Sequence, residues 1–103
     1  MRRAEVSMHG LAAGVLEEIK SGEKFRFAYY ESYNGPPVSL TMPVVEKEFI
    51  FDRFPPFFDG LLPEGLLLEG LLKQGKIDKY DYFRQLVAVG NDLVGAVTVQ
   101  ELK

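Results

Sequence analysis

The sequence predicts an α+β fold, in which a small, twisted, mainly antiparallel sheet carries two or three short helices. Three features of the chain point to it. Apolar and polar residues alternate with period two in the first part of the chain, which is typical of strands. Leucines then recur with helical spacing, and an apolar segment at residues 96–100 follows the helices. Strands, then helices, then one returning strand favour α+β. At 103 residues we expect one domain, spanning residues 1–103.

The expected strands cover residues 4–8, 15–20, 24–29, 38–42 and 96–100. Turns are predicted at His9-Gly10 and at Ser21-Gly22, where glycine permits a tight reversal. Two prolines remove backbone donors and predict a loop over residues 33–37. Period two in the third strand places Phe25, Phe27 and Tyr29 on one face.

Three helices are predicted in the second half. Residues 54–58 can open a short helix, because proline is tolerated in a first turn. The next helix begins at Pro63 and ends at Gly75, with Leu67, Leu68, Leu71 and Leu72 on its inner face. Asp78 is the expected N-cap of the third helix, and Gly90 its stop. The expected core includes Phe83, Leu86, Leu71 and Val97.

Charge and composition argue against several classes of partner. Net charge is −3 and no basic run is present, so we expect no direct nucleic-acid binding and no attraction to an anionic membrane. No apolar leader follows the N-terminus, and the apolar stretch near Leu61 to Leu72 is interrupted by charges and proline. The chain contains no cysteine, which favours a cytoplasmic location.

The residues needed for common catalytic chemistry are missing. His9 is the only histidine, so neither a nucleophile–base pair nor a usual zinc site can be assembled, and we expect no enzyme, metal or cofactor. The segment from Gly70 to Ile77 matches G-x-x-x-x-G-K, but Ile77 stands where a P-loop needs Ser or Thr. Three acidic pairs could be imagined as acid–base groups: Glu17 with Glu18, Asp59 with Glu64, and Asp78 with Asp81. The plainer interpretation is a solvated strand edge, helix-start charges and an N-cap.

One leucine departs from the helical pattern. At about 100° per residue, Leu66 falls among Glu69, Gly70 and Lys73, opposite the leucine face. An exposed leucine is common on protein surfaces. The alternative is an apolar tip that inserts into a partner, since Gly65 adjoins it and a turn at residues 60–63 leads into it.

Several motifs resemble a known family in their order along the chain. Residues 57–64, Phe-Phe-Asp-Gly-Leu-Leu-Pro-Glu, resemble the F-F-D-x-L-L-P-[DE] signature of the N-terminal subdomain of HipA-type serine kinases. Residues 82–90 resemble the helix that leads to a glycine in that family, and residues 91–99 resemble its following strand entry. Residues 38–43 resemble its "LSLSLP" strand. The similarity extends over nearly the whole chain.

The resemblance implies a function through partners. The chain ends at Lys103 without kinase motifs, so it is similar to HipS, the small member of three-part HipB–HipS–HipT toxin–antitoxin systems. An antitoxin of this kind would bind a HipT-like serine kinase and inhibit it in trans, with a HipB-like DNA-binding protein in a ternary complex. The alternative is a non-catalytic subunit that completes the kinase fold and supports its activity. The expected partner-binding residues are Asp59, Gly60, Leu61, Leu62, Pro63, Glu64, Gly65, Leu66 and Leu67.

Overall fold

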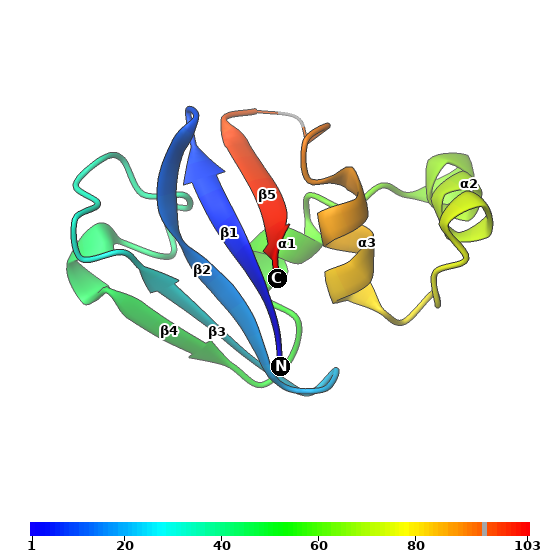
Figure 1. The fold of residues 1–103 in the computed structure, drawn as a ribbon, viewed down its shortest axis with the longest axis horizontal. Helices are drawn as coiled ribbons and strands as arrows, with labels where there is room; N and C mark the ends of the chain where they lie inside the picture. Colours follow the sequence, from blue (N-terminus) through cyan, green and yellow to red (C-terminus); the bar gives the residue numbers. More distant parts are fainter. Residues whose placement is uncertain (94) are drawn as a thin grey trace.

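The computed structural model describes residues 1–93 and 95–103 and confirms the α+β class. A five-stranded antiparallel sheet has the strand order β4-β3-β2-β1-β5. In Figure 1 helix α3 lies beside β5, and α2 lies beyond α3, away from the sheet. Val94, within the segment that resembles the family's strand entry, is outside the described residues. The elements are β1 (Arg2–Met8), β2 (Leu11–Lys20), β3 (Lys24–Tyr29), the short 3-10 helix η1 (Val44–Glu46), β4 (Glu48–Phe51), α1 (Pro56–Asp59), α2 (Gly65–Gly75), α3 (Tyr82–Val89) and β5 (Val97–Leu102).

Both predicted hairpin turns are present, and the last strand returns as expected. His9 and Gly10 have positive φ values of 51° and 81°, which reverse the chain between β1 and β2. β5 pairs with β1, from Met8 opposite Val97 to Arg3 opposite Leu102. The N-terminal strand is therefore internal to the sheet, with a partner on each side.

The core lies between one face of the sheet and helices α1 and α3. Phe25, Phe27 and Tyr29 all point into it, as the period of two predicts. Helix α1 contributes Phe58, whose ring lies 5.9 Å from that of Phe27 between centroids, and α3 contributes Phe83 and Leu86. The end of α3 touches β5 so closely that a Cβ on Gly90 would lie 1.8 Å from the Val99 carbonyl oxygen. α3 is thus fixed to the sheet at its C-terminal end.

The strand predicted at residues 38–42 is wrong, and its place at the sheet edge is taken by β4. Val38 and Met42 are buried, but Leu40 between them is 95% exposed, so the alternation does not describe one sheet face. The Tyr29 hydroxyl explains the irregular path, because it accepts a hydrogen bond from the Val38 N–H and donates one to the Met42 carbonyl. The segment is anchored by a side chain rather than by a strand ladder.

Two predictions about the helices also need correction. Asp81, not Asp78, caps α3, since its carboxylate accepts a hydrogen bond from the Arg84 N–H at 3.1 Å. The Asp78 carboxylate accepts instead from the Tyr80 N–H in the preceding turn. Helix α2 begins at Gly65 rather than Pro63 and contains no buried residue. Leu71 is therefore only half-buried, whereas Phe83, Leu86 and Val97 are core residues as expected.

The leucine side chains of α2 are at least partly exposed because the helix lies away from the sheet. It contacts α3 and has no sheet opposite its leucine row, so that row cannot be fully covered. Among the described residues, no helix has both the length and the apolar character needed to cross a membrane.

Candidate protein-docking surface

An apolar groove of about 530 Å³ opens between the α1–α2 connection and the C-terminal end of α3. We call it the leucine groove. Side chains from three parts of the chain meet there, and leucines dominate the wall. Its lining consists of Gly60, Leu61, Leu62, Pro63, Leu67, Leu71, Val89, Asp92 and Leu93. An opening of this composition can accept an apolar side chain from another molecule.

Helix α1 fixes one wall of the groove. Phe58 is fully buried and holds the helix against the sheet. The N–H groups of Leu61 and Leu62 then donate to the carbonyls of Phe58 and Asp59, at 3.0 and 3.2 Å. These turns continue the helical path for one further step, and both Leu61 and Leu62 then line the groove.

Helix α2 forms the opposite wall and starts at an unusual backbone conformation. Gly65 has φ of +59°, in the left-handed region that favours glycine, and open space surrounds its Cα. The next two side chains, Leu66 and Leu67, are 84% and 77% exposed. Two adjacent leucines in water are an apolar surface without an internal partner.

The structure brings together five of the nine residues predicted for partner binding: Gly60, Leu61, Leu62, Pro63 and Leu67. Leu66 does not line the groove, and its exposure agrees with its predicted place off the leucine face. Leu67 was expected on the inner face, and this is wrong, because α2 contacts α3 rather than the sheet and leaves Leu67 77% exposed.

The remaining predicted residues lie around this surface. Asp59, Glu64 and Gly65 are exposed and do not line the groove. Sequence reasoning missed Val89, Asp92 and Leu93, which come from the end of α3 and the segment after it. The helical leucine spacing does include Leu71, but no local signal places it opposite residues 89–93.

Acidic side chains surround the groove. Asp92 lines the groove, and the exposed Asp59 and Glu64 directly adjoin its lining residues Gly60 and Pro63. Apolar walls with a negatively charged surround suit a partner surface that combines an apolar projection with basic side chains.

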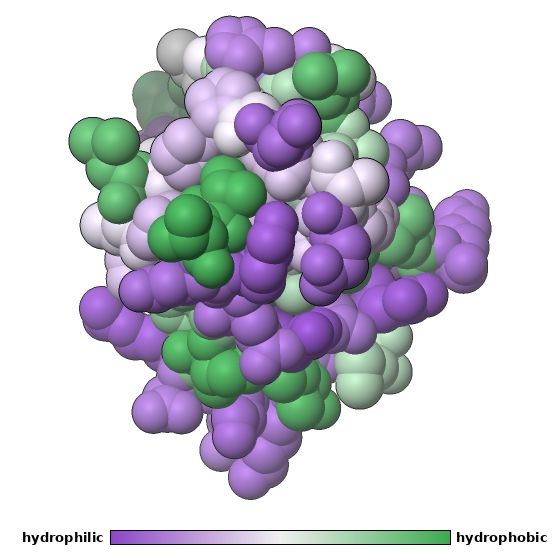
Figure 2. Space-filling view, turned by 90° about the vertical axis from the view of Figure 1, so that its left-hand side faces the viewer, coloured by the Kyte–Doolittle hydropathy of each residue, from purple (hydrophilic) through white to green (hydrophobic). Residues whose placement is uncertain are grey.

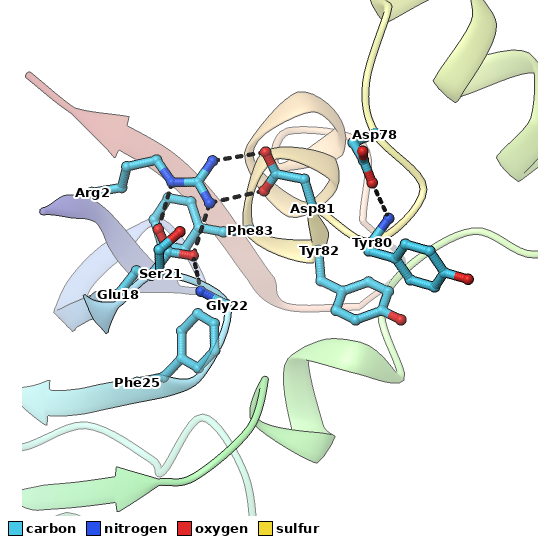
Figure 3. A pocket seen from close by; sticks show the side chains of 10 residues that line it. All are labelled: Arg2, Glu18, Ser21, Gly22, Phe25, Asp78, Tyr80, Asp81, Tyr82 and Phe83. Atoms are coloured by element: carbon cyan, nitrogen blue, oxygen red, sulfur yellow. Dashed lines mark hydrogen bonds and ion pairs between the residues drawn. The ribbon is translucent and has the colours of Figure 1, made fainter.

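A second pocket, of about 310 Å³, is built around the Arg2 guanidinium (Figure 3). Arg2 donates to both carboxylate oxygens of Glu18, at 2.8 Å each, and to both of Asp81, at 3.0 and 2.8 Å. The guanidinium carbon also lies 5.0 Å from the centroid of the Phe83 ring. We call Arg2, Glu18 and Asp81 the arginine clamp. It joins β1, β2 and the N-terminus of α3.

The clamp sets the protonation of its carboxylates. Hydrogen bonds from Arg2 lower the pKa of Glu18, against the opposing effect of burial. Burial alone would raise the pKa of Asp81, but hydrogen bonds from Arg2 and from the Arg84 N–H outweigh it and lower that pKa. Glu18 also accepts from the Gly22 N–H at 3.1 Å, and its side chain is only 7% exposed. The expectation that Glu17 and Glu18 form a solvated strand edge is therefore wrong for Glu18.

These contacts favour a structural role for the clamp. Both carboxylates are engaged by a cation and by backbone N–H groups, which leaves them poorly placed for acid–base work. The structure also argues against catalysis at the P-loop-like segment and at His9. Residues 70–75 are helical within α2, which is not a phosphate-binding loop, and His9 is an exposed turn residue. Within residues 1–93 and 95–103 no cluster of three or more His, Cys, Asp or Glu could hold a metal ion.

Comparison with known proteins places this geometry in a family. The model of the HipA N-terminal domain matches residues 4–100. A solved structure of the N-terminal domain of HipA toxin superposes with a TM-score of 0.78 at 31% identity, covering all of this chain and 94% of the other. An uncharacterized protein of Haemophilus influenzae is 37% identical over 103 residues, covering all of this chain and 95% of the relative. The chain belongs to the HipA N-terminal domain family.

Proposed function

We propose that this protein is an antitoxin that binds a HipT-like serine kinase and inhibits it in trans. The observation that carries the proposal is the leucine groove, which includes Leu67, together with the adjoining exposed Leu66; both leucines closely follow the HipA-like signature in the chain. The matched family is the N-terminal domain of HipA rather than a kinase catalytic domain, which supports a binding role without catalysis.

The energetics favour docking through this surface. Full burial of one leucine side chain contributes roughly 1.5–3 kcal/mol. Leu66 and Leu67 contribute little of this to the free protein because both are mostly exposed. Their burial against a kinase would therefore supply new stabilisation, and apolar anchors of this kind commonly dominate an interface.

Inhibition is proposed to follow from where the tip docks. The tip consists of residues 60–67, with Leu66 as the projecting side chain. Placed at the kinase active site, an apolar side chain would block substrate or hold the glycine-rich loop away from a productive position. A cytoplasmic location and a ternary complex with a HipB-like DNA-binding protein complete the proposal.

A second candidate is a subunit that completes the kinase fold and supports its activity. It is favoured by the solved structure of the same fold, which is a domain of the HipA toxin. Both candidates use the same apolar surface, so they differ in the sign of the effect rather than in its location.

Co-expression separates the two. A HipT-like kinase is induced alone, with this protein, and with its Leu67→Asp variant. The matched control is Ile19→Asp, which changes an exposed apolar residue of β2, 39% exposed. We expect the wild type and Ile19→Asp to restore growth and Leu67→Asp to fail. Increased toxicity on co-expression would identify the completing subunit, and no effect on toxicity would contradict both.

A further inference from the structure

Strand β4 is an open edge of the sheet, at the opposite end of the molecule from α2 (Figure 1). Edge strands are commonly protected by short length, by charged side chains, by proline or by a bulge. β4 is four residues long and has one charged side chain, Glu48, but it contains no lysine or proline and its register with β3 is regular. Ile50 at the centre of the strand is 49% exposed.

The register shows which backbone groups of β4 face outward. The Tyr29 N–H donates to the Lys47 carbonyl at 2.8 Å, so positions 29 and 47 form a hydrogen-bonded pair. The alternation of an antiparallel ladder then bonds Phe49 and Phe51 to β3 and turns the backbone of Glu48 and Ile50 away from it. In the described part of the chain, the N–H and C=O groups of Glu48 and Ile50 form no backbone hydrogen bond outside the sheet ladder.

An apolar groove of about 480 Å³ adjoins this edge. Phe49 and Phe51 share the face of β4 that carries Phe27 and Phe25 on β3, so they point toward the core side. A strand added beside β4 would place alternate side chains over the same groove. The groove is lined by Thr41, Met42, Glu48, Phe49, Ile50, Phe51, Pro56 and Phe57.

Charge distinguishes between the strands that could occupy the edge. A second copy that paired antiparallel about Ile50 would place Glu48 directly opposite Asp52 in both halves. Like charges opposite one another destabilise a strand pair. Glu48 is 52% exposed beyond its ion pair with Arg26, and Asp52 is exposed as well. Basic residues suit these positions, and an apolar residue suits each position over the groove.

We propose that an extended segment of a partner protein, with alternating apolar and basic residues, adds as a strand to β4. Main-chain hydrogen bonds to Glu48 and Ile50 supply the pairing, and the groove selects apolar side chains. Figure 2 shows the face at this end of the molecule, where apolar groups are interspersed with polar ones. Because the edge is remote from the leucine groove, both surfaces can be occupied at once.

The probe is a synthetic peptide of alternating valine and lysine, added to the full chain while amide hydrogen exchange is followed by NMR. We expect the Glu48 and Ile50 amides to become protected, while those of Phe49 and Phe51, already bonded to β3, change little. Ile50→Pro removes one outward N–H and no bond to β3, and should weaken binding about tenfold. Ile50→Lys should weaken binding of the basic peptide while keeping the backbone donor. Ile19→Lys, the same change on β2, is the control and should leave affinity unchanged.

A peptide of alternating valine and glutamate should bind more weakly than the lysine peptide. Absence of protection at Glu48 and Ile50 with the lysine peptide would overturn the proposal, as would protection confined to the leucine groove. Sedimentation of the protein alone completes the test. A dimer that protects the same two amides and is lost in Ile50→Lys would assign the edge to a second copy and overturn the partner strand.

Discussion

Leucine has opposite roles in two regions of the molecule: the sheet with α3, and the arm formed by residues 60–75. Leu86 on α3 is fully buried between helix and sheet. Leu66 on α2 is 84% exposed, and its helix has no buried residue. The first region is stabilised by its own core, whereas Leu66 and Leu67 of the arm stay largely exposed. An apolar helix face therefore does not by itself indicate a core, because the element opposite it decides.

The largest expected contrast is between Leu86→Ala and Leu66→Ala. The chemical change is identical, but Leu86→Ala leaves a cavity in the core and should lower the free energy of unfolding by about 2–5 kcal/mol. Leu66→Ala should change it by less than about 0.5 kcal/mol. Urea denaturation of both variants measures the difference. Equal destabilisation would show that the arm packs into the fold after all.

The arginine clamp sharpens the comparison, because it ties α3 to the sheet and has no equivalent in α2. Arg2→Met keeps the aliphatic stem but leaves Glu18 buried without its cation. We expect the free energy of unfolding to fall by about 2 kcal/mol, since the Glu18 side chain is desolvated while Arg2 and Asp81 are partly exposed. Thermal melting checks this. Adding Glu18→Gln should restore part of the stability, and a double variant that melts lower than the single one would count against the clamp.

The clamp also predicts how stability depends on pH. The pKa values of Glu18 and Asp81 are lowered from 4.5 and 3.8, so the folded state resists protonation more than the unfolded state does. The two carboxylates therefore stabilise the fold at pH values above their ordinary pKa values, and this stabilisation is lost as pH falls through their lowered pKa values. The free energy of unfolding should thus decline below about pH 5, and the decline should be shallower in Arg2→Met. Denaturant titrations across this range test it, and parallel slopes for the two proteins would contradict it.

A smaller effect is expected at the start of the arm. Gly65→Ala places a Cβ on a residue with positive φ and should cost about 1 kcal/mol, although no atom lies in the way. Gly70→Ala is the control, because Gly70 is helical with open space around it and its substitution should stabilise by about 0.5–1 kcal/mol. Thermal melts that move in the same direction for both variants would remove the special role of Gly65.

Local patterns in the sequence predicted the fold well where one face of an element is buried. The alternation of Phe25, Phe27 and Tyr29 and the final strand were correct for this reason. The same alternation failed at residues 38–42, where the Tyr29 hydroxyl holds the backbone in a loop. A hydrogen bond from a distant side chain leaves no periodic signal.

The arginine clamp shows a different limit. Counting back from the turn at His9-Gly10 without interruption pairs Arg2 with Glu17. The register shift between Val6 and Ser7 pairs it with Glu18 instead and brings that carboxylate to the core side. A single extra residue in a strand exchanges the two faces, and nothing in the local composition marks its position.

The lining of the leucine groove could be predicted in part, while its role in docking stays a prediction. The family-like signature includes Gly60 to Pro63, and the predicted partner-binding segment extends to Leu67; these residues line the groove. The assignment of Leu67 to an inner face failed, because helical spacing gives the direction of a side chain relative to its helix but not what lies opposite. Val89, Asp92 and Leu93 complete the groove through tertiary contact alone.

The central claim, that the leucines of the arm serve a partner and not the fold, is tested most directly by one titration. Wild type and the double variant Leu66→Ala with Leu67→Ala are titrated against the activity of a HipT-like kinase, and both proteins are melted. We expect unchanged melting and inhibition weakened at least about tenfold, because two apolar anchors are lost from the interface. Full inhibition by a variant that melts like the wild type would contradict the account.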